Sequence, residues 1–508
     1  MSAREPTALN PLPTHELCAQ ANPDRLFVIA SLFSARPKAL TEARVLELGA
    51  GHGGNIVSLA TMYPATRFTA EVADERAAEA IRSWQQTLDL ANLEVRVGAS
   101  QSESEAFDYI LCPHAFRALE REQRSELLTG IKNRLAPQGV ALMAYPVLPG
   151  AYFERMTGEM MAYHAGQFSD PASRAPQARA MLDFLANSAE PQAYRTLLGQ
   201  EAERLRGSDV ALSQTLQGGG QQALYVNDFF GLAQAAGLQY LGEAPLSAML
   251  PENFGESIAQ TLRRIGADVF RSEQYIDFLS ARRQRFSLLM HAGVGLDRNV
   301  TAQRIGRWHV AANVREEDGG RFIGPGGGDF TARSPLTRRV LSELARRWPQ
   351  SEALAELLQR FELAPDAAQA STLMADLLQC YMLGAVELRS QALPVSRDPG
   401  ENPQAWPVAR FQAQATAAGA RAAVPCALHA ALDVDEFTRY LLGRLDGSRD
   451  RAALLRDLEA AIEEGVLSLQ ENGRAVTESA RRRELLSNGL DQALQKLGQA
   501  GLLCRSDA

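Results

Sequence analysis

The fold of this chain is decided by the stretch Val45-Leu-Glu-Leu-Gly-Ala-Gly-His-Gly-Gly-Asn55. It begins in a short apolar strand, residues 44–48, and runs directly into the apolar helical pattern IVSLATM. Glycines between a strand and a helix let the backbone approach a ligand closely and leave N–H groups free to bind it. The spacing G-x-G-x-G differs from the G-x-G-x-x-G of dinucleotide-binding loops. Glu47 either holds the loop amides or receives an ammonium group of the ligand. The alternative is that these glycines only form a tight turn.

Strand and helix patterns alternate around this loop. After the first strand, strands are predicted over 67–72, 93–97, 107–111 and 140–145, with helices over 74–88 and 121–135. Such alternation predicts parallel strands with right-handed crossovers and a ligand at their carboxyl ends. Two later patterns, 238–241 and 285–291, are candidates for the last strands of the same sheet.

The remaining chain is predicted to be mostly helical, with amphipathic helices at 152–166, 175–187 and 192–206. Two later segments are each predicted to form three helices and a strand, and the strand of the second segment is predicted at 466–469. This pattern favours winged-helix-like modules. The glycine-rich residues 323–328 and the proline-containing residues 394–407 are interpreted as linkers. The expected division is a helical lead-in at 1–42, an α/β core at 43–150, a helical middle region at 151–322, and modules at 335–393 and 408–508.

Composition excludes several classes of function. A chain of 508 residues is expected to form about three domains. Its formal charge of −8 argues against a nucleic-acid partner, which a basic field would favour. No apolar stretch of about 18 residues is present to cross a membrane, and the N-terminus lacks a signal-peptide pattern. The five cysteines form no disulfide framework and no metal-ligand spacing, so we expect a cytoplasmic protein without a metal site.

The glycine loop resembles motif I of the class I S-adenosylmethionine (SAM)-dependent methyltransferases, whose fold is Rossmann-like. Together with Asp108-Tyr-Ile-Leu111 and Ala144-Tyr-Pro-Val-Leu-Pro-Gly150, it resembles the rickettsial-type protein-lysine methyltransferases. Those bacterial enzymes join a methyltransferase domain to a regulatory region, and some methylate lysines of outer-membrane proteins. The resemblance implies SAM as cofactor and a protein substrate, including an outer-membrane or surface protein before export. It leaves a homodimer open.

The resemblance also implies a set of cofactor-binding residues. They are Glu47, Gly49, Ala50, Gly51, Gly53, Asn55, Glu71, Asp74, Ser100 and Cys112. Two positions depart from the family pattern. Where the family has an Asp that binds the ribose, this chain reads Ala70-Glu71-Val72, so we predict Glu71 for that role, with Asp74 as the fallback. Where an acid usually accepts from the adenine, this chain has Gly98-Ala-Ser-Gln101.

Methyl transfer requires the acceptor lone pair to point at the sulfonium methyl from about 3 Å, so positioning supplies much of the rate. A lysine acceptor must also lose a proton, which a dry, aromatic-lined channel favours by desolvation. The predicted channel residues are Phe116, Tyr145, Tyr152 and Tyr163, with His114 or His164 as proton acceptor. Tyr145 is the strongest candidate, because it ends the fifth strand beside the expected cofactor edge. The alternative for each of these residues is a packing role.

Three functions remain open on the sequence alone. The first is lysine methylation of a protein, with residues 335–508 recognising the substrate and taking no part in the chemistry. The second is a catalytically degenerate scaffold, because the ribose and adenine acids depart from the pattern. The third is methylation of a small molecule or of a maturing peptide whose leader is bound by the last module. His429 has no acidic or nucleophilic neighbour in sequence and is predicted to be structural.

Overall fold

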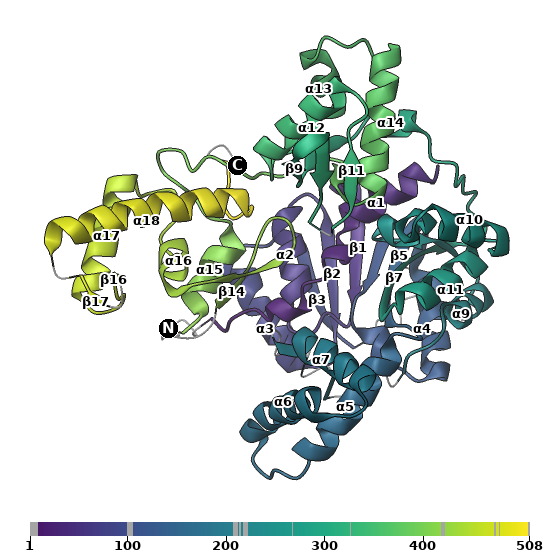
Figure 1. Cartoon of the computed structure of the whole chain (residues 1–508), viewed down its shortest axis with the longest axis horizontal. Helices are drawn as coiled ribbons and strands as arrows, with labels where there is room; N and C mark the ends of the chain where they lie inside the picture. The colour runs from purple at the N-terminus through teal and green to yellow at the C-terminus, as the bar shows by residue number, and fades with distance from the viewer. Residues whose placement is uncertain are drawn as a thin grey trace. The chain divides into compact units, whose positions relative to one another are not determined.

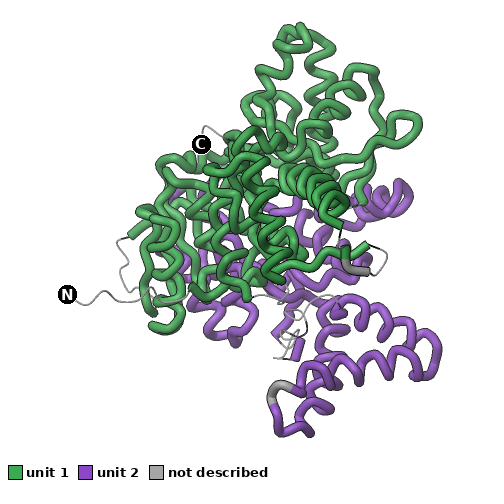
Figure 2. Tube along the Cα trace, turned by 90° about the vertical axis from the view of Figure 1, so that its left-hand side faces the viewer, with its two compact units in different colours: residues 1–110, 138–140, 295–508 green, residues 111–137, 141–294 purple. Residues whose placement is uncertain are grey.

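The structure is a computed structural model that describes residues 9–98, 105–206, 212, 215–216, 222–266, 268–325, 327–417, 422–471, 474–476 and 478–505. The chain divides into two compact units (Figure 2). Unit 1 contains residues 1–110, 138–140 and 295–508, and unit 2 contains residues 111–137 and 141–294. In the described part of the chain, no helix is both long and apolar enough to span a bilayer.

The main sheet has seven strands in the order β3-β2-β1-β4-β5-β7-β6. Its strands are β1 (Arg44–Leu48), β2 (Arg67–Val72), β3 (Leu93–Val97), β4 (Phe107–Cys112), β5 (Leu135–Pro146), β6 (Leu238–Glu243) and β7 (Gln284–His291). Strands β1, β2 and β3 pair in parallel, whereas β7 pairs antiparallel with both β5 and β6. The prediction that the segments near 238 and 285 supply the last strands is confirmed.

The first three α-helices of unit 1 lie before and between the early strands of the sequence, and short polar side chains cap the N-termini of the first and the third. They are α1 (Pro23–Leu32), α2 (Gly54–Met62) and α3 (Glu75–Thr87), preceded by the short helix η1 (Thr14–Glu16). Asn22 accepts from the Asp24 amide at the start of α1. Asp74 accepts from the Ala77 amide, 2.9 Å away, at the start of α3. Each cap satisfies an N–H group that has no partner inside its helix.

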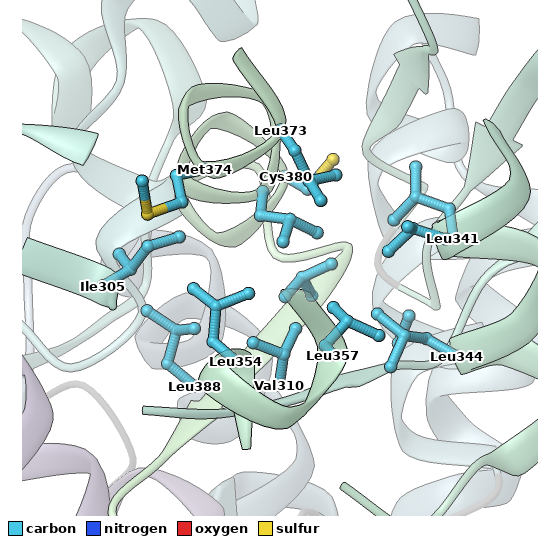
Figure 3. Packing of buried hydrophobic residues seen from close by; sticks show 14 of the residues in the cluster. Ile305, Val310, Leu341, Leu344, Leu354, Leu357, Leu373, Met374, Cys380 and Leu388 are labelled. Carbon is cyan, nitrogen blue, oxygen red and sulfur yellow. The ribbon is translucent and has the colours of Figure 1, made fainter. Parts of the chain in front are cut away.

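The first predicted module is a hydrophobic subdomain of unit 1, built from α12 (Pro335–Arg347), β12 (Glu352–Ala353), α13 (Leu354–Arg360), α14 (Ala368–Met382) and β13 (Val386–Arg389). Its small sheet has the order β12-β8-β13, so β8 (His309–Ala312) belongs to it although it precedes residue 335. Leucine side chains such as Leu341, Leu357 and Leu373 fill its core (Figure 3). Val28 and Leu32 of α1 pack into the same core.

The interpretation of residues 323–328 and 394–407 as free linkers is wrong. The first range joins β10 (Arg321–Ile323) to β11 (Asp329–Thr331), which pair with β9 (Arg315–Glu317) in a three-stranded sheet. In the second range, Ala405 forms a bridge with Leu503, and Val395 forms one with Cys504. Backbone hydrogen bonds therefore hold the second range against the end of the chain. A buried backbone group cannot bond to water and needs such a partner within the protein.

The last part of unit 1 contains α15 (Pro407–Ala415), a hairpin of β14 (Ala422–Pro425) and β15 (Ala431–Val434), α16 (Glu436–Leu442), α17 (Arg451–Glu463) and α18 (Ser479–Gln499). Helices α17 and α18 pack against each other (Figure 1). The predicted strand at 466–469 is wrong. The short hairpin instead lies at β16 (Gln470–Glu471) and β17 (Arg474–Ala475), because Gly465 at φ 74° turns the chain immediately before the apolar pair Val466-Leu467.

Unit 2 contains η4 (Ala115–Ala118), α4 (Arg121–Arg134), α5 (Ala151–Ala165), α6 (Pro171–Ser188), α7 (Gln192–Arg206), α9 (Val226–Ala235), α10 (Glu256–Ile265) and α11 (Val269–Ser280). Helices α5, α6 and α7 pack together around Met161, Leu182 and Leu198. Elsewhere in the unit, the guanidinium of Arg285 is fully buried and binds the carboxylates of Glu243 and Asp277.

Candidate functional site

The glycine loop between β1 and α2 has backbone φ angles that residues with a side chain rarely adopt. Gly49, Gly51 and Gly53 have φ values of 65°, 54° and 95°, all in the left-handed region. The Ala50 amide donates to the Glu71 carbonyl oxygen at 2.9 Å, which fixes the loop against the end of β2. The loop then leads into α2, where backbone N–H groups at a helix N-terminus are available to an acceptor.

A carboxylate from the N-terminal residues lies on these amides. Glu16 of η1 accepts from the His52 amide at 3.0 Å and from the Gly54 amide at 2.8 Å. A Cβ atom placed on Gly51 would lie only 2.3 Å from Glu16 Oε1. Gly51 therefore has two constraints, its positive φ and the close approach of Glu16. Nothing in the sequence pattern identified Glu16, which lies 36 residues before the amide that it binds.

Glu47 is fully buried at the end of β1 and has one oxygen without a partner. Its Oε2 accepts from Asn55 Nδ2 at 2.9 Å, whereas Oε1 has no hydrogen-bond partner among the described residues. Burial raises the pKa of this carboxyl to about 8. A buried acceptor without a partner is costly unless a ligand satisfies it. Glu47 therefore fits the ammonium-binding role that was one of its two predicted roles.

Asn55, the last residue of the quoted stretch, connects three distant parts of the chain. Its Oδ1 accepts from the Cys18 amide at 3.0 Å and lies 2.7 Å from Nε2 of His429. Its Nδ2 donates to Glu47. His429 is fully buried, and burial lowers its pKa to about 3. The structure thus places a residue of the last module in contact with the loop. The sequence predicts only substrate recognition for that module and does not predict this contact.

The ends of β2 and β3 hold the predicted ribose and adenine positions. Glu71 is buried at the end of β2 and is paired in register with Arg96 of β3. Asp74 caps α3, so its carboxylate already has a structural partner. Gly98 follows β3 with φ 76° and open space where a side chain would stand. Ser100 lies outside the described residues. The role of Glu71 stays a prediction.

The predicted acceptor residues of unit 2 fall into two separate groups. Tyr145 is fully buried, with its hydroxyl 2.9 Å from Ser287 Oγ and its ring stacked on Phe229 at 4.1 Å. Phe116 packs edge-on against the same two rings. These contacts fit the packing role that was the alternative for Tyr145 and Phe116, and a catalytic role for Tyr145 stays a prediction.

Tyr152 and Tyr163 of α5 instead line a largely apolar groove of about 700 Å³, and Tyr163 is 79% exposed. His164 is half-buried on the same helix and packs edge-on against Phe168. Cys112 is buried at the end of β4, and His114 is half-buried just before η4. Tyr145 and Phe116 therefore lie in a buried cluster, whereas Tyr152 and Tyr163 line the groove. The roles predicted for the two histidines stay predictions.

Three family models match the chain in sequence order. Residues 45–139 match a methyltransferase domain, residues 218–291 match a predicted methyltransferase regulatory domain, and residues 401–502 match the PKMT C-terminal winged helix domain. The last match begins within the range that had been interpreted as a linker. It therefore places α15 and the β14–β15 hairpin inside the winged-helix domain.

Known relatives are similar over nearly the whole chain. The uncharacterized protein RP789 of Rickettsia prowazekii is 23% identical over 96% of this chain and 91% of its own length. The structure of PKMT2 from Rickettsia typhi has a TM-score of 0.81 at 22% identity, covering 96% of this chain and 99% of PKMT2. A second PKMT2 structure, in complex with AdoHcy, has a TM-score of 0.83.

The glycine loop, the strand order and the domain matches define a class I SAM-dependent methyltransferase. More narrowly, the chain matches, in order, the models of a methyltransferase domain, a methyltransferase regulatory domain and a PKMT C-terminal winged helix domain, and it has the fold of PKMT2. Its cofactor is SAM, and two observations fit that molecule: the left-handed glycine loop and the partnerless oxygen of Glu47.

Proposed function

We propose that the protein transfers the methyl group of SAM to lysine side chains of a protein substrate. The observation that supports this most directly is the PKMT winged-helix domain, which lies in the same chain as the methyltransferase domain. PKMT2, whose fold this chain shares, was solved in complex with AdoHcy, the compound that SAM becomes after giving up its methyl group. We infer that this chain also uses SAM as methyl donor and leaves AdoHcy as the product.

The residues of the loop bind and orient the cofactor in this proposal. Glu47 accepts the cofactor's ammonium through its free Oε1, and the left-handed glycines allow close approach of the backbone. SAM supplies the activated methyl group on its sulfonium. Because SAM carries a net positive charge that AdoHcy lacks, carboxylates near the loop favour substrate cofactor over product. Glu47 and Glu16 each have a carboxyl group in contact with this loop.

Transfer from methyl-labelled SAM to a detergent extract of bacterial outer-membrane proteins tests the proposal. We expect label on protein, and mass spectrometry should locate it on lysine side chains. The matched acceptor control is the same extract after acetylation of its lysines, which removes the nucleophilic amine. The enzyme control is Gly51→Val, which puts a branched side chain at a positive φ and against the Glu16 carboxylate.

Equal labelling of acetylated and untreated extract would contradict lysine methylation while leaving the methyltransferase assignment intact. Binding of SAM without labelling of any protein, together with labelling of small molecules in the soluble fraction, would favour a small-molecule acceptor. Absence of SAM binding by calorimetry would instead support the scaffold alternative.

A further inference from the structure

We propose that His429 of the winged-helix domain is a positioning residue for the cofactor: it holds the Asn55 carboxamide, and through it the carboxyl of Glu47. The winged-helix domain thereby takes part in SAM binding, in addition to any contact with substrate. This inference rests on the SAM-binding loop and not on lysine as the acceptor. All of the residues involved lie in unit 1.

The hydrogen bonds determine how each group must be oriented. The Cys18 amide can only donate, so the atom of Asn55 that faces it is the oxygen. Asn55 Nδ2 then faces Glu47 and donates to it. His429 Nε2 lies 2.7 Å from the same Asn55 oxygen and must therefore carry a proton. Because burial keeps this imidazole neutral, its Nδ1 is unprotonated.

The backbone of the hairpin is shaped to present this side chain. His429 lies in the turn between β14 and β15 with φ 58°, a conformation that costs free energy for a residue with a Cβ. Two bonds close the turn, from the His429 amide to the Cys426 carbonyl at 3.0 Å and from the Cys426 amide to the Ala430 carbonyl at 2.9 Å. The Ala427 amide binds the Gly501 carbonyl, which anchors the turn to the end of α18.

A second connection joins the same domain to the loop. Gln412 of α15 accepts from the Leu12 amide at 2.7 Å and donates to the Leu12 carbonyl at 3.1 Å. Four residues later, Glu16 accepts from the loop amides. The winged-helix domain thus holds the loop from two sides, through Asn55 and through the N-terminal residues. A histidine needed only for packing would not have to donate a hydrogen bond to Asn55, the residue whose carboxamide orients Glu47.

The test uses three substitutions of His429 in the full-length protein, with SAM affinity measured by calorimetry in the absence of any acceptor. His429→Ala removes the donor, and we expect the dissociation constant to rise about fivefold to tenfold, as for one buried hydrogen bond. His429→Gln places an amide nitrogen near the position of Nε2, where it can donate to Asn55. We therefore expect affinity within about twofold of the natural protein. His429→Asn suits the positive φ but is too short to reach Asn55, and it should behave like His429→Ala.

Leu490→Ala is the matched control for general loss of stability. Leu490 is fully buried in α18 of the same domain and contributes no hydrogen bond to the loop. It should lower the melting temperature at least as much as His429→Ala while leaving SAM affinity unchanged. Normal affinity of His429→Ala, failure of His429→Gln to restore binding, or equal weakening by Leu490→Ala would each overturn the proposal.

Discussion

At the scale of single residues, the cofactor loop depends on polar groups that burial keeps uncharged in the free protein. Glu47 is fully buried, and its pKa is raised to about 8. At neutral pH it is therefore mostly protonated until a cation arrives. Its neighbour His429 is buried and neutral because its pKa is lowered to about 3. The site thus gains its charge when the cofactor binds, and it avoids an isolated buried carboxylate in the free protein.

Binding of SAM should release a proton from Glu47. Below its raised pKa the free carboxyl holds a proton, and accepting an ammonium requires the carboxylate, so affinity should rise as pH rises toward about 8. Above about pH 8 the α-amino group of SAM loses its own proton, so affinity should fall again. In Glu47→Gln the rise between pH 6.5 and 7.5 should disappear, and binding should be weaker at pH 7.5. Calorimetry at pH 6.5, 7.5 and 8.5, in buffers of different ionisation enthalpy, measures both affinity and proton release. A pH profile shared by the natural protein and Glu47→Gln would contradict this role.

At the scale of elements, the antiparallel end of the sheet is joined to α11 by a buried ionic cluster. Arg285 of β7 binds Asp277 through Nε and Nη2, at 2.9 and 2.8 Å, and Glu243 of β6 through Nη1 at 2.9 Å. Glu273 of α11 is also buried beside the guanidinium. Together with Arg282, the cluster holds three carboxyl groups against two cations, and burial raises the pKa of Glu273 to about 7.

Substitutions in this cluster should have opposite effects on the free energy of unfolding. Arg285→Met leaves carboxylates buried without their cation and should cost about 3–5 kcal/mol. Glu273→Gln should be nearly neutral at pH 5. Because the folded pKa of Glu273 is raised, the natural protein loses stability as pH rises from about 4.5 to 7, so the variant should be more stable at pH 8 by about 1–2 kcal/mol. Urea unfolding at both pH values measures this. A Glu273→Gln variant less stable at pH 8 would show that the carboxylate is needed.

At the scale of the molecule, unit 1 gathers residues from both ends of the chain onto one loop. Cys18, Asn55 and His429 meet at a single carboxamide, although the histidine is 374 positions away from the asparagine. The winged-helix domain is therefore a structural part of the cofactor site. A ligand that binds the loop should stabilise this distant domain, because whatever binds the folded arrangement also opposes its opening.

Hydrogen–deuterium exchange should detect that effect. With saturating SAM, we expect slower exchange in the turn 426–430 as well as in the loop 49–55, and in the N-terminal residues near Leu12. Helices α17 and α18 lie in the same domain and share no side-chain hydrogen bond with the loop among the described residues, so their change in exchange should be smaller than that of the turn. Protection limited to residues 49–55 would mean that the winged-helix domain does not sense the cofactor.

The order of strands and helices and the glycine loop were predictable from the sequence, because hydrophobic periodicity and glycine position are local properties. Glu47, Gly51 and Asn55 lie in the same local stretch, and their role in binding the cofactor stays a prediction. Only the tertiary structure decided that Tyr145 packs against Phe229 and that Glu16 and His429 reach the loop. Long-range hydrogen bonds leave no periodic trace in a sequence, since any two polar residues can be brought together once the surrounding core is packed.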